Sequence, residues 1–184
     1  MGQRFVERKI RANVFDFEEL SLLSKDLFKS AAEARKNAQA PYSDYYVGVA
    51  IYGESGKLYS GCNVERVSWT QTTHAEQNAV DSMVAAEGPS KIRALALVAA
   101  PKNEEVILQP KVVSATQVTL EEIGVPCGHC LQIIWENCFN DPWVSLMSLM
   151  ANGRISLVTI GDALPFRFGP ADLDVDYSKL GKKI

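Results

Sequence analysis

The stretches His74-Ala75-Glu76 and Pro126-Cys127-Gly128-His129-Cys130 place one imidazole, two closely spaced thiols and one spare carboxylate in the same chain. Three protein ligands leave a tetrahedral zinc ion one open position for water, whereas a fourth thiolate would close the site and make it structural. We therefore predict a catalytic Zn²⁺ site with His74, Cys127 and Cys130 as the ligands. Glu76 stays outside this ligand set and is free to move protons.

His129 lies between the two thiols and invites an interpretation as a fourth ligand. At helical spacing Cys127 and Cys130 share one face, whereas the residue between them projects elsewhere. Because His74 already supplies an imidazole, we predict that His129 does not bind the metal. For the other two cysteines, Cys62 and Cys138, we expect the commoner role of a small apolar residue.

The hydrophobic pattern around these motifs alternates between helices and strands. Leu20, Leu23, Leu27 and Ala31 recur at spacings of three and four, which predicts an amphipathic helix that begins at Asp16 and ends near 39–41. Two further helices are expected, from Thr72-Thr73 to Gly88-Pro89 and over 127–138. Strands are expected at 47–52, 57–62, 92–99, 143–149 and 154–159, the first two as a hairpin around Gly53-Glu54-Ser55-Gly56.

These elements predict an α/β fold, a three-layer α/β/α sandwich around a mixed five-stranded sheet. The zinc ligands would then lie at two helix N-termini, where unpaired N–H groups and the helix dipole favour thiolate and hydroxide. With 184 residues, of which 47% are hydrophobic, the chain can bury one core, so we expect a single domain over 1–184. The segment 102–125 has no clean period, and we expect an insertion that covers or lines the active site.

The overall charge and hydropathy of the chain indicate which classes of partner to expect. Lys and Arg total 19 against 22 Asp and Glu, and the basic residues are scattered along the chain. This balance gives no basic stripe for a polyanion, so no nucleic acid partner is expected. The N-terminus lacks the apolar core of a secretory signal, and no window approaches the roughly 20 apolar residues that span a bilayer. We therefore expect a cytoplasmic protein without a membrane partner.

The motifs resemble those of the cytidine deaminase family, for which H-x-E with P-C-x-x-C is the signature of the zinc site. The similarity covers about 17–175, which we take as the core of the domain. It is carried by 40–48 (APYSDYYVG), 61–65 (GCNVE), 73–77 (THAEQ), 126–130 (PCGHC) and 164–173 (LPFRFGPADL). The resemblance implies zinc-dependent hydrolytic deamination of cytidine, deoxycytidine or a related pyrimidine nucleoside to the uridine product and ammonia.

The resemblance also implies roles for individual residues. Glu76 would take a proton from the attacking water and pass it to the ring nitrogen and then to the departing ammonia. Asn63 and Glu65 would hold the sugar hydroxyls, and Tyr45 sits where the family usually has a Phe that packs on the pyrimidine. Ala75 belongs to the substrate-binding set as well, and Phe168 matches an aromatic residue that a neighbouring subunit contributes. The resemblance therefore implies a homo-oligomer, a dimer or tetramer, with active sites near the subunit interfaces.

Three positions depart from the family's pattern. Arg66 replaces an Asn, Trp69 stands where a smaller or different ring is usual, and Leu131 replaces an Arg. Zinc with two thiolates and one neutral imidazole is formally uncharged, which offers a reason why Leu131 suffices. Arg66 and Trp69 could reshape the pocket, so the exact nucleoside stays open.

Two other functions stay open alongside deamination of a free nucleoside. One is deamination of a base within RNA or DNA, although the chain lacks the basic stripe and regularly spaced aromatics typical of strand binding. The other is a non-catalytic, zinc-stabilised scaffold. Glu76 argues against the scaffold, because a structural zinc site needs no free carboxylate.

Overall fold

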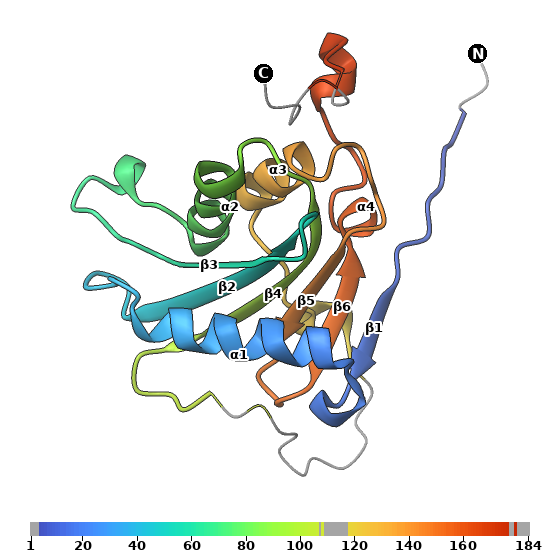
Figure 1. The fold of residues 1–184 in the computed structure, drawn as a ribbon. Helices are drawn as coiled ribbons and strands as arrows, with labels where there is room; N and C mark the ends of the chain where they lie inside the picture. Colours follow the sequence, from blue (N-terminus) through green and yellow to red (C-terminus); the bar gives the residue numbers. More distant parts are fainter. Residues whose placement is uncertain (1–3, 107, 109–117, 177–178, 180–184) are drawn as a thin grey trace.

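Six strands form one mixed sheet in the computed structural model, which describes residues 4–106, 108, 118–176 and 179 (Figure 1). Their order across the sheet is β1-β6-β5-β4-β2-β3. The central pair β4 and β5 is parallel, and the other neighbours are antiparallel. The strands are β1 (Ala12–Phe15), β2 (Tyr45–Gly53), β3 (Leu58–Cys62), β4 (Ile92–Pro101), β5 (Ser145–Leu149) and β6 (Ile155–Thr159).

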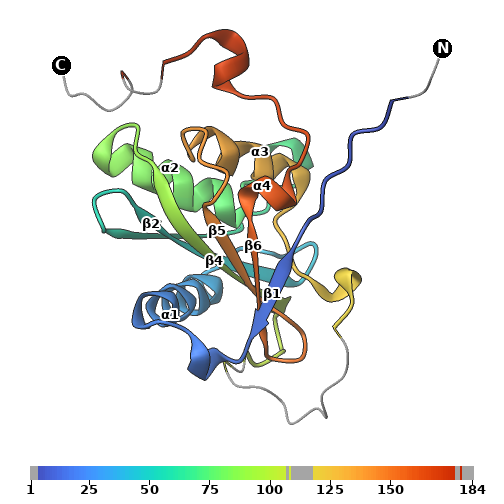
Figure 2. The ribbon, with the colours of Figure 1, turned by 90° about the vertical axis from the view of Figure 1, so that its right-hand side faces the viewer.

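Helices cover both faces of this sheet and complete three layers. Figures 1 and 2 show α1 on one face and α2, α3 and α4 on the other. The helices are α1 (Leu22–Lys36), α2 (Ala75–Glu87), α3 (Gly128–Glu136) and the short α4 (Ile160–Ala163). Short 3-10 turns occupy Phe17–Glu19, Trp69–Gln71, Leu120–Glu122 and Pro170–Leu173. No helix in the described ranges has the length and apolar character needed to cross a bilayer.

The hydrophobic core has two halves that meet at β4. Leu95 packs with α2 and α3 residues such as Val80 and Ile134, whereas Ala96 packs with Leu27 and Phe28 of α1. This alternation follows from the two-residue period of a strand, which sends neighbouring side chains to opposite faces. The unbroken apolar run at 92–99 is thus explained by a strand that helices cover on both sides.

The predicted α/β sandwich is confirmed, but its sheet has six strands and not five. The additional strand is β1, which pairs antiparallel with β6 in a register that places Ala12 opposite Val158. Its four residues are too few to show a clear alternation of apolar and polar side chains. The formation of β1 therefore depends on its pairing with β6, which lies more than a hundred residues further along the chain. That the whole chain forms one domain remains a prediction.

The first long helix begins later than predicted, because Ser21 and not Asp16 is its N-cap. The Ser21 hydroxyl accepts a hydrogen bond from the backbone N–H of Ser24 at 3.2 Å. Asp16 instead precedes the short Phe17–Glu19 turn, where its own N–H donates to Glu19. The two cap signals lie five residues apart, and the apolar spacing that begins at Leu20 fits either start.

Two glycines let the helices approach the sheet closely. A Cβ at Gly48 would collide with the carbonyl oxygen of Ala31, so α1 crosses β2 at this position. A Cβ at Gly61 would collide with the N–H of Ala79 and lie 2.7 Å from the carbonyl oxygen of Ala75. Gly61 therefore sets the distance between β3 and the first turns of α2, the helix that follows His74.

Candidate active site

Three metal-binding side chains converge at the N-termini of α2 and α3. His74 is the N-cap residue of α2, Cys127 is the N-cap residue of α3, and Cys130 lies in the first turn of α3. Their ligand atoms all lie within 4.8 Å of one another. The Nδ1 atom of His74 is 3.5 Å from Cys127 Sγ and 3.3 Å from Cys130 Sγ. Within the described ranges, no other group of three or more such donors comes together.

This donor set fits zinc. Two thiolates and one imidazole are the soft and borderline ligands that a tetrahedral Zn²⁺ ion takes, with one position left over. Burial raises the pKa of the Cys130 thiol above its usual value, and the nearby carboxylate of Glu76 raises it further. A thiolate at this position therefore needs a cation, which a metal ion bound at the site provides. The predicted Zn²⁺ cofactor is consistent with this geometry.

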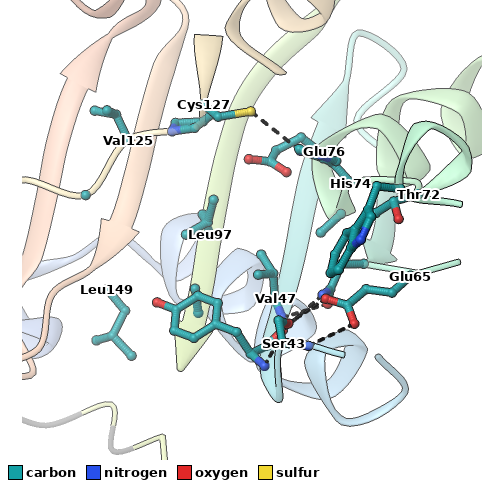
Figure 3. Close-up of a pocket in the computed structure, with 17 residues that line it drawn as sticks. Ser43, Val47, Glu65, Thr72, His74, Glu76, Leu97, Val125, Cys127 and Leu149 are labelled. Carbon is teal, nitrogen blue, oxygen red and sulfur yellow. Dashed lines mark hydrogen bonds between the residues drawn. The ribbon is translucent and has the colours of Figure 1, made fainter. Parts of the chain in front are cut away.

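The fourth nearby donor, Glu76, is not part of the ligand group. Its side chain is in the first turn of α2 and only 5% of the residue is exposed. Figure 3 shows its carboxylate turned into the cavity beneath Cys127. A buried carboxylate beside the metal donors but outside their set is placed to accept and donate protons.

Two of the donors, His74 and Cys127, line a pocket of about 540 Å³, which is large enough for a small molecule (Figure 3). Its walls come from the start of β2, the segments before α2 and α3, and the ends of β4 and β5. Four of the predicted substrate-binding residues, Tyr45, Asn63, Glu65 and Ala75, line it together with Glu76. The remaining lining residues are Ser43, Val47, Trp69, Thr72, His74, Leu97, Ala99, Gly124, Val125, Pro126, Cys127 and Leu149.

Glu65 is a buried carboxylate that the chain holds in its charged form. It accepts hydrogen bonds from the backbone N–H groups of Tyr42 and Ser43, at 2.9 and 3.2 Å, and from the Ser43 hydroxyl. Burial alone would raise the pKa of Glu65, but these hydrogen bonds together lower it below its usual value. Glu65 therefore ties the segment before β2 to the pocket wall and presents a charged acceptor there.

Asn63 holds the edge of the pocket through the backbone of β2. Its Oδ1 accepts from the N–H of Val47 at 2.9 Å, and its Nδ2 donates to the carbonyl oxygen of Tyr45 at 3.0 Å. Each of these amide atoms can make one further hydrogen bond. Tyr45 stands at the start of β2 and is 45% exposed, so its ring is open to a ligand.

Phe168 does not line this pocket, unlike the other predicted substrate-binding residues. It lies in the segment that follows α4, and its carbonyl oxygen accepts a hydrogen bond from Gln132 of α3 at 2.8 Å. Its side chain is 60% exposed. Within a single chain, the ring of Phe168 therefore does not form part of the pocket described above.

Several lining residues were not predicted. Leu97, Ala99 and Leu149 belong to strands whose apolar pattern shows burial, but not which strand end meets the metal donors. Gly124 and Val125 belong to the expected insertion, and they do line the pocket. Residues 107 and 109–117 of that segment lie outside the described residues.

Three minor predictions can be compared with the structure. The ring of His129 lies 5.6 Å from the ring of His74, but His129 is not part of the donor group. Cys138 is fully buried, as expected for a small apolar residue, and Cys62 is partly buried. None of the four cysteines forms a disulfide.

Comparison with known proteins agrees with this geometry. A family model described as the cytidine and deoxycytidylate deaminase zinc-binding region matches residues 23–144, which include all three metal donors and Glu76. A cytidine deaminase of Sporosarcina psychrophila is 33% identical over 147 residues, covering 80% of this chain and 92% of that protein. One from Halalkalibacterium halodurans is 31% identical over 148 residues, covering 80% and 96%.

Solved structures show the same relationship. The crystal structure of cytidine deaminase from Burkholderia pseudomallei has a TM-score of 0.59 at 29% identity, covering 78% of this chain and 98% of that one. The structure of the Mycobacterium tuberculosis enzyme has a TM-score of 0.57 at 28% identity, covering 79% and 97%. With the family match spanning most of its length and its zinc donors assembled, the chain belongs to the cytidine and deoxycytidylate deaminase family.

Proposed function

We propose that this protein hydrolyses the exocyclic amino group of cytidine, deoxycytidine or a related pyrimidine nucleoside, releasing ammonia and the uridine product. One observation carries the proposal: the buried carboxylate of Glu76 lines the same pocket as His74 and Cys127 but lies outside the metal-binding group that these two form with Cys130. A structural zinc site has no use for such a carboxylate. A hydrolytic site needs a group that transfers protons between water and the leaving amine.

Zinc held by His74, Cys127 and Cys130 would supply a Lewis acid that makes a water molecule nucleophilic at neutral pH. The chain's own part in the proton transfers falls to Glu76. Its carboxylate takes one proton from the attacking water and gives it to the pyrimidine ring nitrogen. It then takes the remaining proton of the hydroxyl group now bonded to the ring carbon and delivers it to the departing amino group, which leaves as ammonia. Because Glu76 is nearly buried, these transfers occur away from bulk water.

The other lining residues orient the nucleoside in the pocket. Glu65, which is charged and fixed by three hydrogen bonds, accepts hydrogen bonds from the sugar hydroxyls. Asn63 makes one further hydrogen bond to the sugar from each of its two amide atoms. Tyr45 packs on the pyrimidine ring, and Ala75 forms a small apolar part of the wall beside it. This arrangement suits a free nucleoside better than a base within a nucleic acid strand, because the chain has no excess of basic residues.

We also propose a homo-oligomer, a dimer or tetramer, in which Phe168 completes the pocket of a neighbouring copy. The supporting observation is that this aromatic side chain is 60% exposed on its own chain and does not line its own pocket. Pyrimidine salvage in the cytoplasm is the setting that fits a small-molecule hydrolase whose four cysteines form no disulfide.

The test is an ammonia-release assay of the zinc-loaded protein. The panel comprises cytidine, deoxycytidine, ring-modified and N4-substituted cytidines, and a single-stranded oligonucleotide that contains cytosine. We expect turnover of cytidine or deoxycytidine and none of the oligonucleotide. If no nucleoside in the panel released ammonia, the non-catalytic scaffold would replace the enzyme as the better account.

A further inference from the structure

The segment that follows α4 alternates between exposed and covered side chains. Phe166 and Phe168 are 93% and 60% exposed. Arg167, which lies between them, is partly buried, and Gly169 is buried. Alternation of this kind arises because neighbouring side chains of an extended chain point to opposite sides. The contacts on the covered side therefore determine where the exposed rings point.

Arg167 covers a buried indole of α3, the helix that carries Cys130. Trp135 of this helix is only 5% exposed, and the Arg167 guanidinium lies over its ring, 4.3 Å from the ring centroid. This distance is typical of a cation–π contact, in which the planar guanidinium can stack on the ring. The Nη1 atom of Arg167 also donates to the carbonyl oxygen of Leu164 at 3.3 Å. The Arg167 side chain is thus held at both the indole and the backbone of its own segment.

The next two residues are attached to α3 as well. The side-chain amide of Gln132 donates to the carbonyl oxygen of Phe168 at 2.8 Å. A Cβ at Gly169 would lie 2.5 Å from Nε1 of Trp135, so this close approach to the indole requires glycine. Three consecutive residues, 167–169, therefore contact α3, and the backbone that carries the Phe168 ring is fixed on both sides.

An exposed aromatic ring on a fixed backbone is suited to binding another surface. Leaving the Phe168 ring in water costs free energy that burial against a second molecule would recover. Because the backbone is already ordered, less conformational entropy is lost when the ring is buried. The contacts made by Arg167 thus contribute to binding even though its own side chain faces α3.

We propose that Arg167 is a positioning residue that, by stacking on Trp135, holds Phe168 in the orientation in which its ring enters the pocket of a neighbouring copy. The inference rests on the oligomer of the proposed function and adds the residue that orients the contributed ring. It assigns to the pair of Arg167 and Trp135 an effect on the substrate affinity of a different chain.

The first test is a double-mutant cycle, measured by calorimetric titration of the zinc-loaded protein with uridine, which needs no turnover. Arg167→Met keeps the apolar stem and is expected to raise the Kd about fivefold, whereas Arg167→Lys keeps a cation and should lose less affinity. In a Phe168→Ala protein, Arg167→Met should change the Kd by less than about twofold, because the ring that it positions is gone. Arg93→Met is the matched control, since Arg93 forms an exposed ion pair with Glu54 and does not line the pocket.

The second test is a mixed oligomer, which shows whether the effect passes from one copy to another. Arg167→Met chains and Glu76→Gln chains, carrying different tags, are co-expressed and purified through both tags. The Glu76→Gln partner retains Arg167 and Phe168 but lacks the carboxylate for proton transfer. Part of the activity should therefore regain the wild-type KM for cytidine. A partner with both substitutions should leave the KM raised.

Three results would overturn this inference. One is a Kd for uridine that Arg167→Met leaves unchanged, or raises equally with and without the Phe168 ring. Another is a mixed oligomer that keeps the raised KM, because the effect would then lie within one chain. The third is a wild-type monomer, or dissociation caused by Arg167→Met, in light scattering. Zinc content and melting temperature exclude misfolding of each variant. If the double-mutant cycle gave the expected result in a protein that released no ammonia, deamination would be refuted and the inference would stand.

Discussion

The Nδ1 atom of His74 lies 3.3 Å from Cys130 Sγ although 56 positions separate the two residues in the chain. Helix α2 precedes β4 in the sequence and helix α3 follows it, and the fold brings the N-termini of the two helices together. The distance is short enough for one ion to be bound by both side chains and by Cys127.

Removal of one thiol is expected to remove the metal. Cys130→Ala leaves two donors, so zinc measured by elemental analysis should fall from about one ion per chain to a small fraction. Cys62→Ser is the control, because Cys62 is partly buried and outside the donor group. Zinc retained at full stoichiometry by Cys130→Ala would show that this residue is not a ligand. Because burial raises the pKa of the Cys130 thiol, zinc binding at neutral pH should also release protons and weaken as the pH falls.

Loss of the charge on Glu65 is expected to affect both stability and substrate binding. Glu65→Gln removes charge-assisted hydrogen bonds to Tyr42 and Ser43, which should lower the free energy of unfolding by about 1–3 kcal/mol. The KM for cytidine should rise, while zinc content stays the same. An unchanged free energy of unfolding, measured by urea denaturation, would contradict the prediction.

The same variant has a defined pH dependence. The pKa of Glu65 is lower in the folded protein than in the unfolded chain, so its stabilising contribution is present above the unfolded pKa and is lost as the pH falls through the folded pKa. The difference in free energy of unfolding between wild type and Glu65→Gln should therefore be largest near neutral pH and shrink in acid. A difference that grew on acidification would have the wrong sign.

Substitution by alanine should have different effects on stability at two glycines near the metal donors. In Gly61→Ala the new Cβ meets the backbone of α2 at Ala75 and Ala79, which should lower the free energy of unfolding by about 1–3 kcal/mol and weaken zinc binding. Gly128→Ala should be tolerated, although Gly128 lies between Cys127 and Cys130 in the chain, because no atom other than those of its chain neighbours and its own helix backbone lies within 4 Å of the added Cβ. Thermal melts and zinc titration of both variants provide the comparison, and equal effects would contradict it.

Arg35 is expected to hold the end of β4 in place. This nearly buried residue of α1 donates hydrogen bonds to the carbonyl oxygens of Tyr46 at 3.1 Å and Ala100 at 2.9 Å. Arg35→Met keeps the apolar stem but removes the donors, which should lower the free energy of unfolding by about 2–3 kcal/mol. Lys36→Met, one residue along and exposed, should change it by less than about 0.5 kcal/mol. Similar losses in the two variants would contradict the assigned role.

The metal donors and Glu76 could be predicted from sequence because each lies in a short local motif. The spacing of Cys127 and Cys130 limits their distance within one helical turn, and the turn after His74 places Glu76 beside it. The strands at 47–52 and 92–99 were predicted close to their observed bounds, because turn residues and apolar runs mark them locally.

Features that depend on distant parts of the chain could not be predicted in the same way. Strand β1 exists through its pairing with β6, and the four residues Ala12–Phe15 carry no signal of that partner. Leu97 and Leu149 line the pocket because β4 and β5 end beside the helix N-termini, a relation that only the assembled sheet defines. The contribution of Phe168 depends on another copy of the chain and stays a prediction.

The most direct test of the account is the activity of Glu76→Gln. The amide has the size of the carboxylate but cannot accept and deliver the proton, so the rate of ammonia release from cytidine should fall by about 10²–10⁴-fold while zinc content stays at the wild-type level. Gln77→Ala, the next residue on α2 and outside the pocket lining, is the control and should retain activity. A Glu76→Gln protein that kept its zinc and deaminated cytidine at the wild-type rate would contradict the assignment of proton transfer to this carboxylate.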